Sequence, residues 1–208
     1  MIIFVEKITN RLQYIFDFIF KERDLQYMLT DNQEGFLASK ASKFNYSRVS
    51  FDPDILTLIP SSILFRESIY KYTITKNVFH QEECLTLNDK TDPFASIFYI
   101  LTRYEEYQST MIDSHGRQEG KNSVLYRFEW HEKVMCDRWA ENILDYLKTH
   151  CKLQYDKKVY HPKIIPTFDI DKAYAYKHKG IIRTVLSNLK DIWTRNSKQL
   201  SERQRVIN

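Results

Sequence analysis

Glycine and proline are scarce in this chain, which has 4 Gly and 5 Pro among its 208 residues. Because these two residues mark flexible or irregular backbone, long flexible linkers are not expected. The 14 Tyr and 13 Phe favour packed regular structure instead, since aromatic side chains bring large buried area. Hydrophobic residues make up 43% and charged residues 28%, a balance that is typical of globular proteins and argues against disorder.

Cysteine pairs, secretion signals and long apolar runs are also missing. Cys84, Cys136 and Cys151 stand far apart without a CxxC pair, which is typical of reduced thiols rather than of a disulfide framework. The most apolar stretch, residues 14–20, is interrupted by Asp17 and falls far short of the roughly 20 residues of a membrane span. The first residues lack the pattern of a secretory signal. We therefore expect a cytoplasmic protein without a membrane span.

Acidic residues are few at the end of the chain. Residues 172–208 hold nine Lys/Arg against Asp191 and Glu202, which leaves a net charge of −3 for residues 1–171. A basic tail can indicate nucleic acid or a membrane surface as partner. We favour the alternative interpretation, the solvated face of a helix, and therefore expect no nucleic-acid partner.

The first half of the sequence predicts a strand, a helix and then mainly strands. Residues 2–5 form a short apolar run that predicts a strand. Thr9 precedes a stretch with apolar residues at helical spacing, which predicts a capped helix. Further strands are predicted at residues 25–30 and 46–50, so the middle region is expected to be mostly β.

Two longer amphipathic helices are predicted after this region. Asp92 supplies a helix cap and Pro93 a first helical position, and we expect that helix to run to about Tyr107. Residues 134–147 carry apolar side chains in helical register and predict the second helix. Between the helices, residues 113–120 hold two of the four glycines and predict a loop.

The last part of the chain reads as a separate domain. Residues 163–171 are predicted to form an apolar strand that runs into acidic residues, followed by a helix at about residues 180–193. The boundary is expected near residues 155–162. This divides the chain into domains of residues 1–160 and 161–208.

Asp169 and Asp171 are the strongest candidates for chemistry. Side chains two positions apart on a strand share a face, so Thr167, Asp169 and Asp171 are expected to point the same way. Two converging carboxylates can hold a divalent cation, or can divide metal ligation and proton transfer between them. The alternative is structural, with one aspartate capping the following turn and the other in solvent.

Residues 166–171, with the sequence PTFDID, resemble the first motif of the polysaccharide deacetylase (NodB-homology) family, commonly written TFDDG. The order of strand, acidic motif and helix also fits that family. Three upstream stretches, residues 10–20, 92–107 and 113–117, resemble the accessory domain that precedes such a barrel in a group of uncharacterised bacterial proteins. Together with residues 169–179, these stretches cover most of the chain.

The resemblance implies a role for each aspartate. Asp169 matches the first acidic position, the general base, and Asp171 is the nearest match to the second, a metal ligand. Ile170 stands between them, and Lys172 stands where the family has glycine. Family members complete the site with an HxxxH pair, whereas no two of the six histidines here lie three to five residues apart. The cofactor implied for the full-length parent is a divalent metal, with zinc the first choice.

The fold class expected is therefore α/β: a mixed α/β accessory domain followed by the first β-α unit of a deacetylase-like (β/α) barrel that the chain does not complete. The full-length parent is expected to hydrolyse acetyl groups from a carbohydrate substrate, and this chain to be inactive alone. The alternative is a non-catalytic binding or assembly module that acts through the accessory domain. An incomplete barrel also leaves a strand edge unpaired, which favours self-association.

Three further features have both a structural and a functional interpretation, and we favour the structural one for each. Arg103, Glu105 and Glu106 form a surface ion-pair cluster, or they dock the barrel. His115 is exposed or hydrogen-bonded in its loop, or it approaches a carboxylate. The tyrosines at 174 and 176 pack against a neighbouring domain, or they stack on sugar.

Overall fold

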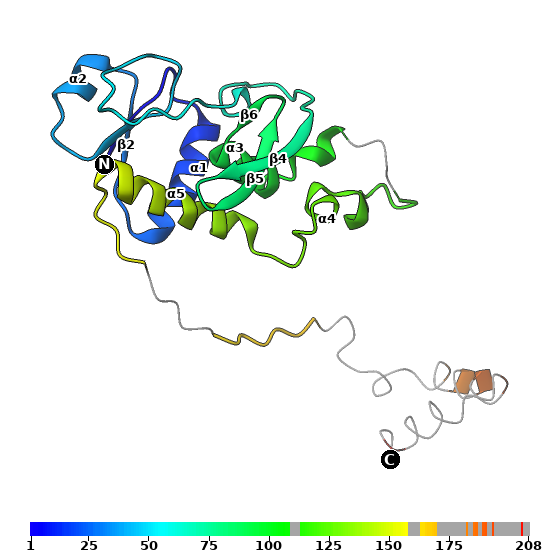
Figure 1. Cartoon of the computed structure of the whole chain (residues 1–208). Coiled ribbons are helices and arrows are strands. Elements are labelled where there is room, and N and C mark those ends of the chain that lie inside the picture. Colours follow the sequence, from blue (N-terminus) through cyan, green and yellow to red (C-terminus); the bar gives the residue numbers. More distant parts are fainter. Residues whose placement is uncertain are drawn as a thin grey trace. The chain divides into compact units, whose positions relative to one another are not determined.

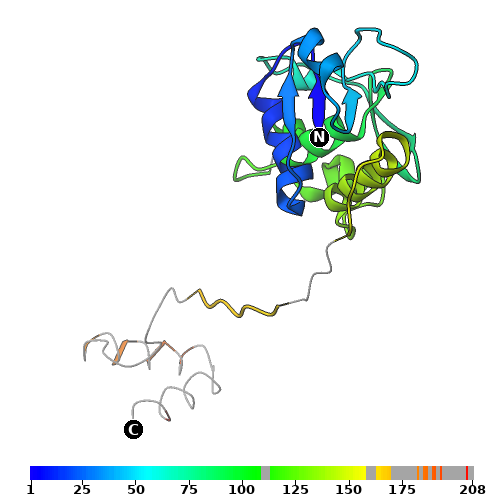
Figure 2. The same cartoon turned by 90° about the vertical axis from the view of Figure 1, so that its left-hand side faces the viewer.

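The parallel strands at the start of the chain form a small sheet inside the first of two units (Figures 1 and 2). The units are Met1–Val159 and Tyr160–Asn208, and all elements labelled below belong to the first. The computed structural model describes residues 1–108, 113–157, 163–169, 182, 185, 186, 189, 190, 193 and 205.

The first unit is mixed α/β, as the composition and patterns predict. Its strands are β1 (Ile2–Phe4), β2 (Met28–Thr30), β3 (Lys43–Asn45), β4 (Ile74–Phe79), β5 (Glu82–Leu87) and β6 (Lys90–Thr91). Its α-helices are α1 (Asn10–Phe20), α2 (Gln33–Ala38), α3 (Pro93–Leu101), α4 (Val124–Arg127) and α5 (Met135–Cys151). Short 3-10 turns lie at Lys21–Arg23, Ser62–Leu64, Tyr104–Gln108 and Gly120–Asn122.

The parallel sheet has the order β2-β1-β3, with β1 in the centre (Figure 2). Successive side chains of β1 point to opposite faces. Ile3 packs into the large core that contains α1, whereas Ile2 and Phe4 pack with Phe36 of α2. The two helices therefore cover opposite faces of the sheet, which is the usual way that parallel sheets are buried.

The second sheet is antiparallel, with the order β4-β5-β6. β5 lies in its centre and buries Cys84, Leu85 and Leu87, while the β4 side chains are mostly exposed. β5 contacts both α3 and α5, and the Trp139 side chain of α5 donates to the Glu83 carbonyl oxygen at 2.7 Å. These contacts join the antiparallel sheet to the helical layer.

The predicted first helix is confirmed as α1. The Thr9 hydroxyl oxygen accepts from the Leu12 N–H at 3.1 Å, as an N-cap residue does, and the same hydroxyl donates to the Leu64 carbonyl oxygen at 2.6 Å. Five apolar side chains of α1 are fully buried at helical spacing: Leu12, Ile15, Phe16, Ile19 and Phe20.

Asp92 caps α3 as predicted and is itself buried. Its carboxylate accepts from the Phe94 and Ala95 N–H groups at 3.0 and 3.1 Å. It also accepts from the Tyr46 hydroxyl and from the Ser61 N–H, both at 2.7 Å. Burial raises the pKa of the Asp92 carboxyl, although each of these hydrogen bonds lowers it. One carboxylate thus joins the start of α3 to two distant loops.

The end of that helix was predicted too far along the chain. α3 ends at Leu101, and Arg103 then adopts a left-handed conformation with φ of 51° before a separate 3-10 turn at Tyr104–Gln108. A left-handed residue breaks the repeating backbone geometry, so the apolar pattern alone overestimates the length of the helix. The second long helix is confirmed as α5, which begins at Met135 and ends at Cys151.

The strand predictions for the N-terminal half are only partly correct. The strand expected at 25–30 is confirmed only for its last three residues, β2. The strand expected at 46–50 is wrong, because β3 ends at Asn45 and a turn follows. The Asn45 side-chain amide donates to the Val49 carbonyl oxygen at 2.7 Å, a local bond that stabilises this turn.

The strand expected at 163–171 is also not found where the structure describes this segment. Residues 163–169, in the second unit, contain neither strand nor helix. Pro166 lies in the middle of the segment and has no N–H to donate to a neighbouring strand. The described positions between 182 and 193 are helical, in agreement with the predicted helix. A barrel fold for this unit stays a prediction.

Candidate functional site

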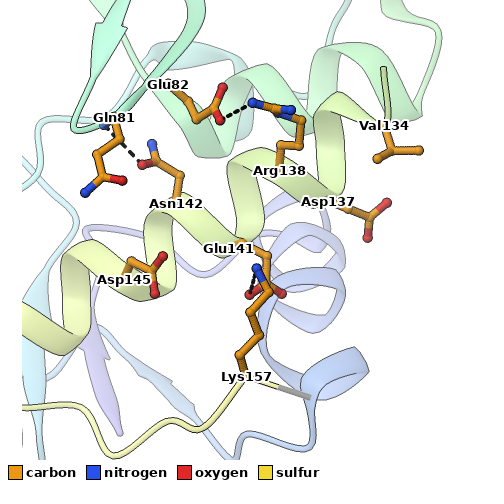
Figure 3. A pocket seen from close by; sticks show the side chains of 9 residues that line it. All are labelled: Gln81, Glu82, Val134, Asp137, Arg138, Glu141, Asn142, Asp145 and Lys157. Carbon is orange, nitrogen blue, oxygen red and sulfur yellow. Dashed lines mark hydrogen bonds and ion pairs between the residues drawn. The ribbon is translucent and has the colours of Figure 1, made fainter. Parts of the chain in front are cut away.

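A surface groove of about 380 Å³ lies beside α5 in the first unit (Figure 3). Its lining is rich in carboxylates and amides and consists of Gln81, Glu82, Val134, Asp137, Arg138, Glu141, Asn142, Asp145 and Lys157. Six of these residues lie on α5 or just before it, in two series with a spacing of four (134, 138, 142 and 137, 141, 145), so they occupy one side of the helix. The opposite face buries Trp139, Ile143 and Leu147 in the core.

The turn between β4 and β5 forms one wall of the groove. The Asn142 side-chain oxygen accepts from the Gln81 N–H at 3.2 Å, and its amide group donates to the Phe79 carbonyl oxygen at 2.7 Å. Arg138 forms an ion pair with Glu82 on the same wall, and Figure 3 draws this pair and the bond between Gln81 and Asn142. The polar side chains of α5 are thereby held against the turn.

Glu141 also lines the groove. Its carboxylate accepts from Arg23 Nε at 2.7 Å and from the Tyr155 hydroxyl at 2.9 Å, and Lys157 Nζ lies 3.6 Å away. Burial by itself raises the pKa of the Glu141 carboxyl, but the hydrogen bonds from Arg23 and Tyr155 outweigh it, and the pKa lies below its ordinary value. Glu141 is therefore held as an anion.

The chain folds back beside α5 after the helix ends. Lys152 is left-handed with φ of 52°, and Leu153 and Tyr155 are buried beyond it. Lys148 Nζ donates to the Tyr155 carbonyl oxygen at 2.8 Å. This return brings Lys157 into the lining of the groove.

The groove offers hydrogen-bonding groups rather than a set of reactive ones. An ionised carboxylate has about four acceptor positions, so Asp137, Asp145 and Glu141 can accept further bonds from a hydroxyl-bearing ligand. Among the residues that the structure describes, no three His, Cys, Asp or Glu side chains gather in a way that could hold a metal ion.

Of the two site residues predicted from the sequence, the structure describes Asp169 but not Asp171. Asp169 belongs to residues 163–169 of the second unit and its side chain is exposed. Asp171 lies outside the described residues, so the predicted pairing of the two carboxylates stays a prediction. Their proposed roles in proton transfer and metal ligation stay predictions as well.

The other singled-out features have structural partners. Arg103 and Glu106 form an ion pair, and the Glu105 carboxylate accepts from the Val124 N–H at 2.9 Å at the start of α4. The N–H of His115 donates to Asp113 Oδ1 at 2.8 Å within its loop. Docking roles for these residues stay untested, and the tyrosines at 174 and 176 lie outside the described residues. Across the described ranges, no helix has the length and apolar character to cross a bilayer.

Comparison with known families classifies the chain. The family described as "Family of unknown function (DUF7033)" matches residues 1–152. The chain belongs to this family. No curated protein and no solved structure matches the chain significantly. The DUF7033 region runs from β1 to the end of α5 and contains every groove residue except Lys157, whereas Asp169 and Asp171 follow it.

Sequence patterns did not reveal the groove of the DUF7033 region. The polar positions of α5 recur every three or four residues from Asp137 to Asp145, which is a visible signal, but it is equally typical of a solvated helix face. Gln81 and Lys157 join the lining only through folding, since neither lies on the helix.

Proposed function

We propose that the chain is the N-terminal portion of a polysaccharide-deacetylase-like protein, in which the DUF7033 region is an accessory module. The catalytic region of the parent begins with Asp169 and Asp171 and removes acetyl groups from a carbohydrate. The resemblance of residues 166–171 to the first deacetylase motif supports this assignment of chemistry.

The observation that carries the proposal is the separation of the motif from the folded DUF7033 unit. The first unit contains its own core, and its family match ends at residue 152. The acidic motif belongs to a second unit that begins at Tyr160. A module that precedes the catalytic region, rather than contributing its acidic residues, is the organisation that this separation favours.

The proposed roles follow from the chemistry of the side chains. Asp169 would accept a proton from the attacking water, and Asp171 would hold a divalent metal, whose chemistry would be to polarise the acetyl carbonyl and stabilise the developing oxyanion. Structural and catalytic zinc sites commonly have three or four protein ligands. Two aspartates supply at most two, so the 208-residue chain is expected to release no acetate by itself.

Acetate release from an N-acetylated oligosaccharide tests the proposal, measured with added zinc for the chain and for any longer product of the same reading frame. A continuing frame that encodes an HxxxH pair should give an active parent. In that parent, Asp169→Asn should lower the rate by roughly 100-fold or more, because general base catalysis commonly contributes that much. Asp31→Asn, an exposed aspartate of the first unit, is the control. An active parent unaffected by Asp169→Asn contradicts the proposed role.

The α5 groove favours a second candidate, a non-catalytic module that binds carbohydrate. Carboxylates and amides line the groove and can accept from or donate to sugar hydroxyl groups. Titration of the chain with neutral oligosaccharides tests this function. Asp145→Ala should weaken saturable binding several-fold, while Asp89→Ala, at a distant exposed turn, should leave it unchanged. Equal affinities for both variants would remove the groove from consideration.

A further inference from the structure

A second cavity, of about 390 Å³, lies where the chain leaves the central strand of the parallel sheet. Its lining comes from two segments that are far apart in the sequence, residues 7–11 after β1 and residues 66–67 after the second 3-10 turn. Open parallel sheets commonly bind ligands outside the carboxyl ends of their strands, where the helices diverge to opposite faces. β1 is such a strand, because α1 and α2 cover different faces of its sheet.

The charges that line this cavity are mainly positive. Lys7, Arg11 and Arg66 face one carboxylate, that of Glu67. The two segments are brought together by the bond of Thr9 to the Leu64 carbonyl oxygen, so the cationic cluster depends on the fold and not on a run of basic residues.

Arg11 is the fixed member of the cluster. One terminal nitrogen donates to the Ile63 carbonyl oxygen at 2.8 Å and the other to the Glu67 carbonyl oxygen at 3.1 Å. The guanidinium also lies 5.3 Å from the ring centre of Phe98. Carbonyl oxygens and an aromatic face position the cation but leave its formal charge unneutralised.

Lys7 and Arg66 are the adjustable members. Lys7 pairs with Glu67 at 3.2 Å, but their side chains are 63% and 89% exposed, and so exposed a pair contributes little. Arg66 lies over the Tyr70 ring at 4.3 Å, and its Nε donates to the Ser62 hydroxyl at 3.3 Å. An anionic ligand can therefore attract both side chains at small cost.

We propose that this cavity binds a small phosphate-bearing molecule. Guanidinium groups match the oxygen geometry of phosphate, and a lysine ammonium adds a compact charge. The volume lies at the lower end of the usual range for small-molecule sites, which suits a phosphorylated metabolite better than a polymer. The proposal does not depend on the deacetylase assignment or on the α5 groove.

Calorimetric titration of the full chain with inorganic phosphate at low ionic strength tests the site. Saturable binding is expected, and Arg66→Gln and Lys7→Gln should each weaken it by about fivefold, the effect of losing roughly 1 kcal/mol of interaction. Glu67→Gln should strengthen binding, because it removes the competing carboxylate. Lys133→Gln, an exposed lysine near the start of α5, is the matched control and should change nothing.

Several outcomes would overturn the site. The first is the absence of saturable binding up to about 10 mM phosphate, because a dissociation constant above that concentration means negligible affinity. The second is equal weakening by Lys133→Gln and Lys7→Gln, which would show attraction to general positive charge. The third is weaker binding by Glu67→Gln. Because Lys7, Arg66 and Glu67 are exposed, thermal unfolding of these variants should match that of the unchanged chain, and the opposite directions expected for Arg66→Gln and Glu67→Gln separate binding from folding.

Discussion

The surroundings of Asp92 and Glu141 show two ways in which one carboxylate joins distant parts of the same unit. Asp92 is 2% exposed, and its four donors are three backbone N–H groups and the hydroxyl of Tyr46. Glu141 lines the groove and receives hydrogen bonds from the guanidinium of Arg23 and from a tyrosine. The pKa is raised at the first site, where burial dominates, and lowered at the second, where the cationic partner outweighs burial.

The two carboxylates differ in whether a ligand can reach them. Asp92 is enclosed by the protein, so its hydrogen bonds contribute to folding and leave no position for a ligand. Glu141 has a similar linking role, but it lies in the lining of an open groove. Opposite pKa shifts predict that the two carboxylates influence stability in opposite directions as the pH falls.

The largest effect is expected for Asp92→Ala. Removing the carboxylate leaves the Tyr46 hydroxyl and the Ser61 N–H buried without an acceptor and removes the cap of α3. The free energy of unfolding should fall by about 3 kcal/mol or more. Urea denaturation followed by tryptophan fluorescence measures the change, with Asp31→Ala as the exposed control. A loss below about 1 kcal/mol would make the Asp92 region no more important than a surface cap.

A smaller decrease in the free energy of unfolding is expected for Arg23→Met. Arg23 is 7% exposed and bonds to Glu141 and Asp137, so methionine fills its space but leaves the partly buried Glu141 without its guanidinium. Because Glu141 can still reach solvent, we expect a loss of about 2 kcal/mol, less than for a fully enclosed pair. The double variant Arg23→Met, Glu141→Gln should recover part of it in the same denaturation experiment. No recovery would mean that Arg23 acts mainly through packing.

The pH dependence of stability sharpens the contrast directly. The raised pKa of Asp92 means that its contribution to stability increases as the pH falls through that raised value towards 3.8. The lowered pKa of Glu141 means that its contribution is present above 4.5 and is lost as the pH falls below that value. Relative to the unchanged chain, Asp92→Asn should therefore lose more stability on acidification, and Glu141→Gln should lose less. Free energies of unfolding measured between pH 3 and pH 7 test this prediction. If the difference from the unchanged chain varied with pH in the same direction for both variants, the comparison would be contradicted.

The smallest effect is expected for Arg103→Ala. The Arg103 side chain is 71% exposed and that of its partner Glu106 is 33% exposed, so water reaches the pair. Exposed pairs of this kind contribute about 0.5 kcal/mol or less, so the free energy of unfolding should hardly change. A loss above about 1.5 kcal/mol, well beyond that range, would show that the pair supports the left-handed turn after α3.

The sequence predicted the elements whose signals are local. α1 and α3 begin at cap residues that precede apolar side chains at helical spacing, and both starts are confirmed. α2 was missed because it is only six residues long and buries one aromatic, Phe36. The β4–β5 hairpin was not delimited because residues 75–77 in the middle of β4 are all polar, and because its turn at residues 80–81 contains no glycine, with His80 in the left-handed conformation.

The cavities depend on contacts between distant residues, so local patterns could not predict them. The groove requires Gln81 beside Asn142, and the cationic cavity requires Arg66 beside Lys7. Asp169 and Asp171, in contrast to the cavity residues, were singled out from the sequence. Their motif was visible in the sequence, but the apolar run before it does not establish a strand when Pro166 interrupts that run.

The reversal of the chain at Lys152 has a mechanical consequence. Tension applied to the chain beyond Lys157 does not first act on the last turn of α5. It acts on Tyr155, whose ring is buried and whose hydroxyl is bonded to Glu141, and through Glu141 on Arg23 in the 3-10 turn that follows α1. The load is thus shared by α5 and the turn that follows α1, and we expect the contacts of Lys157 and Tyr155 to yield before the hydrogen bonds of α5.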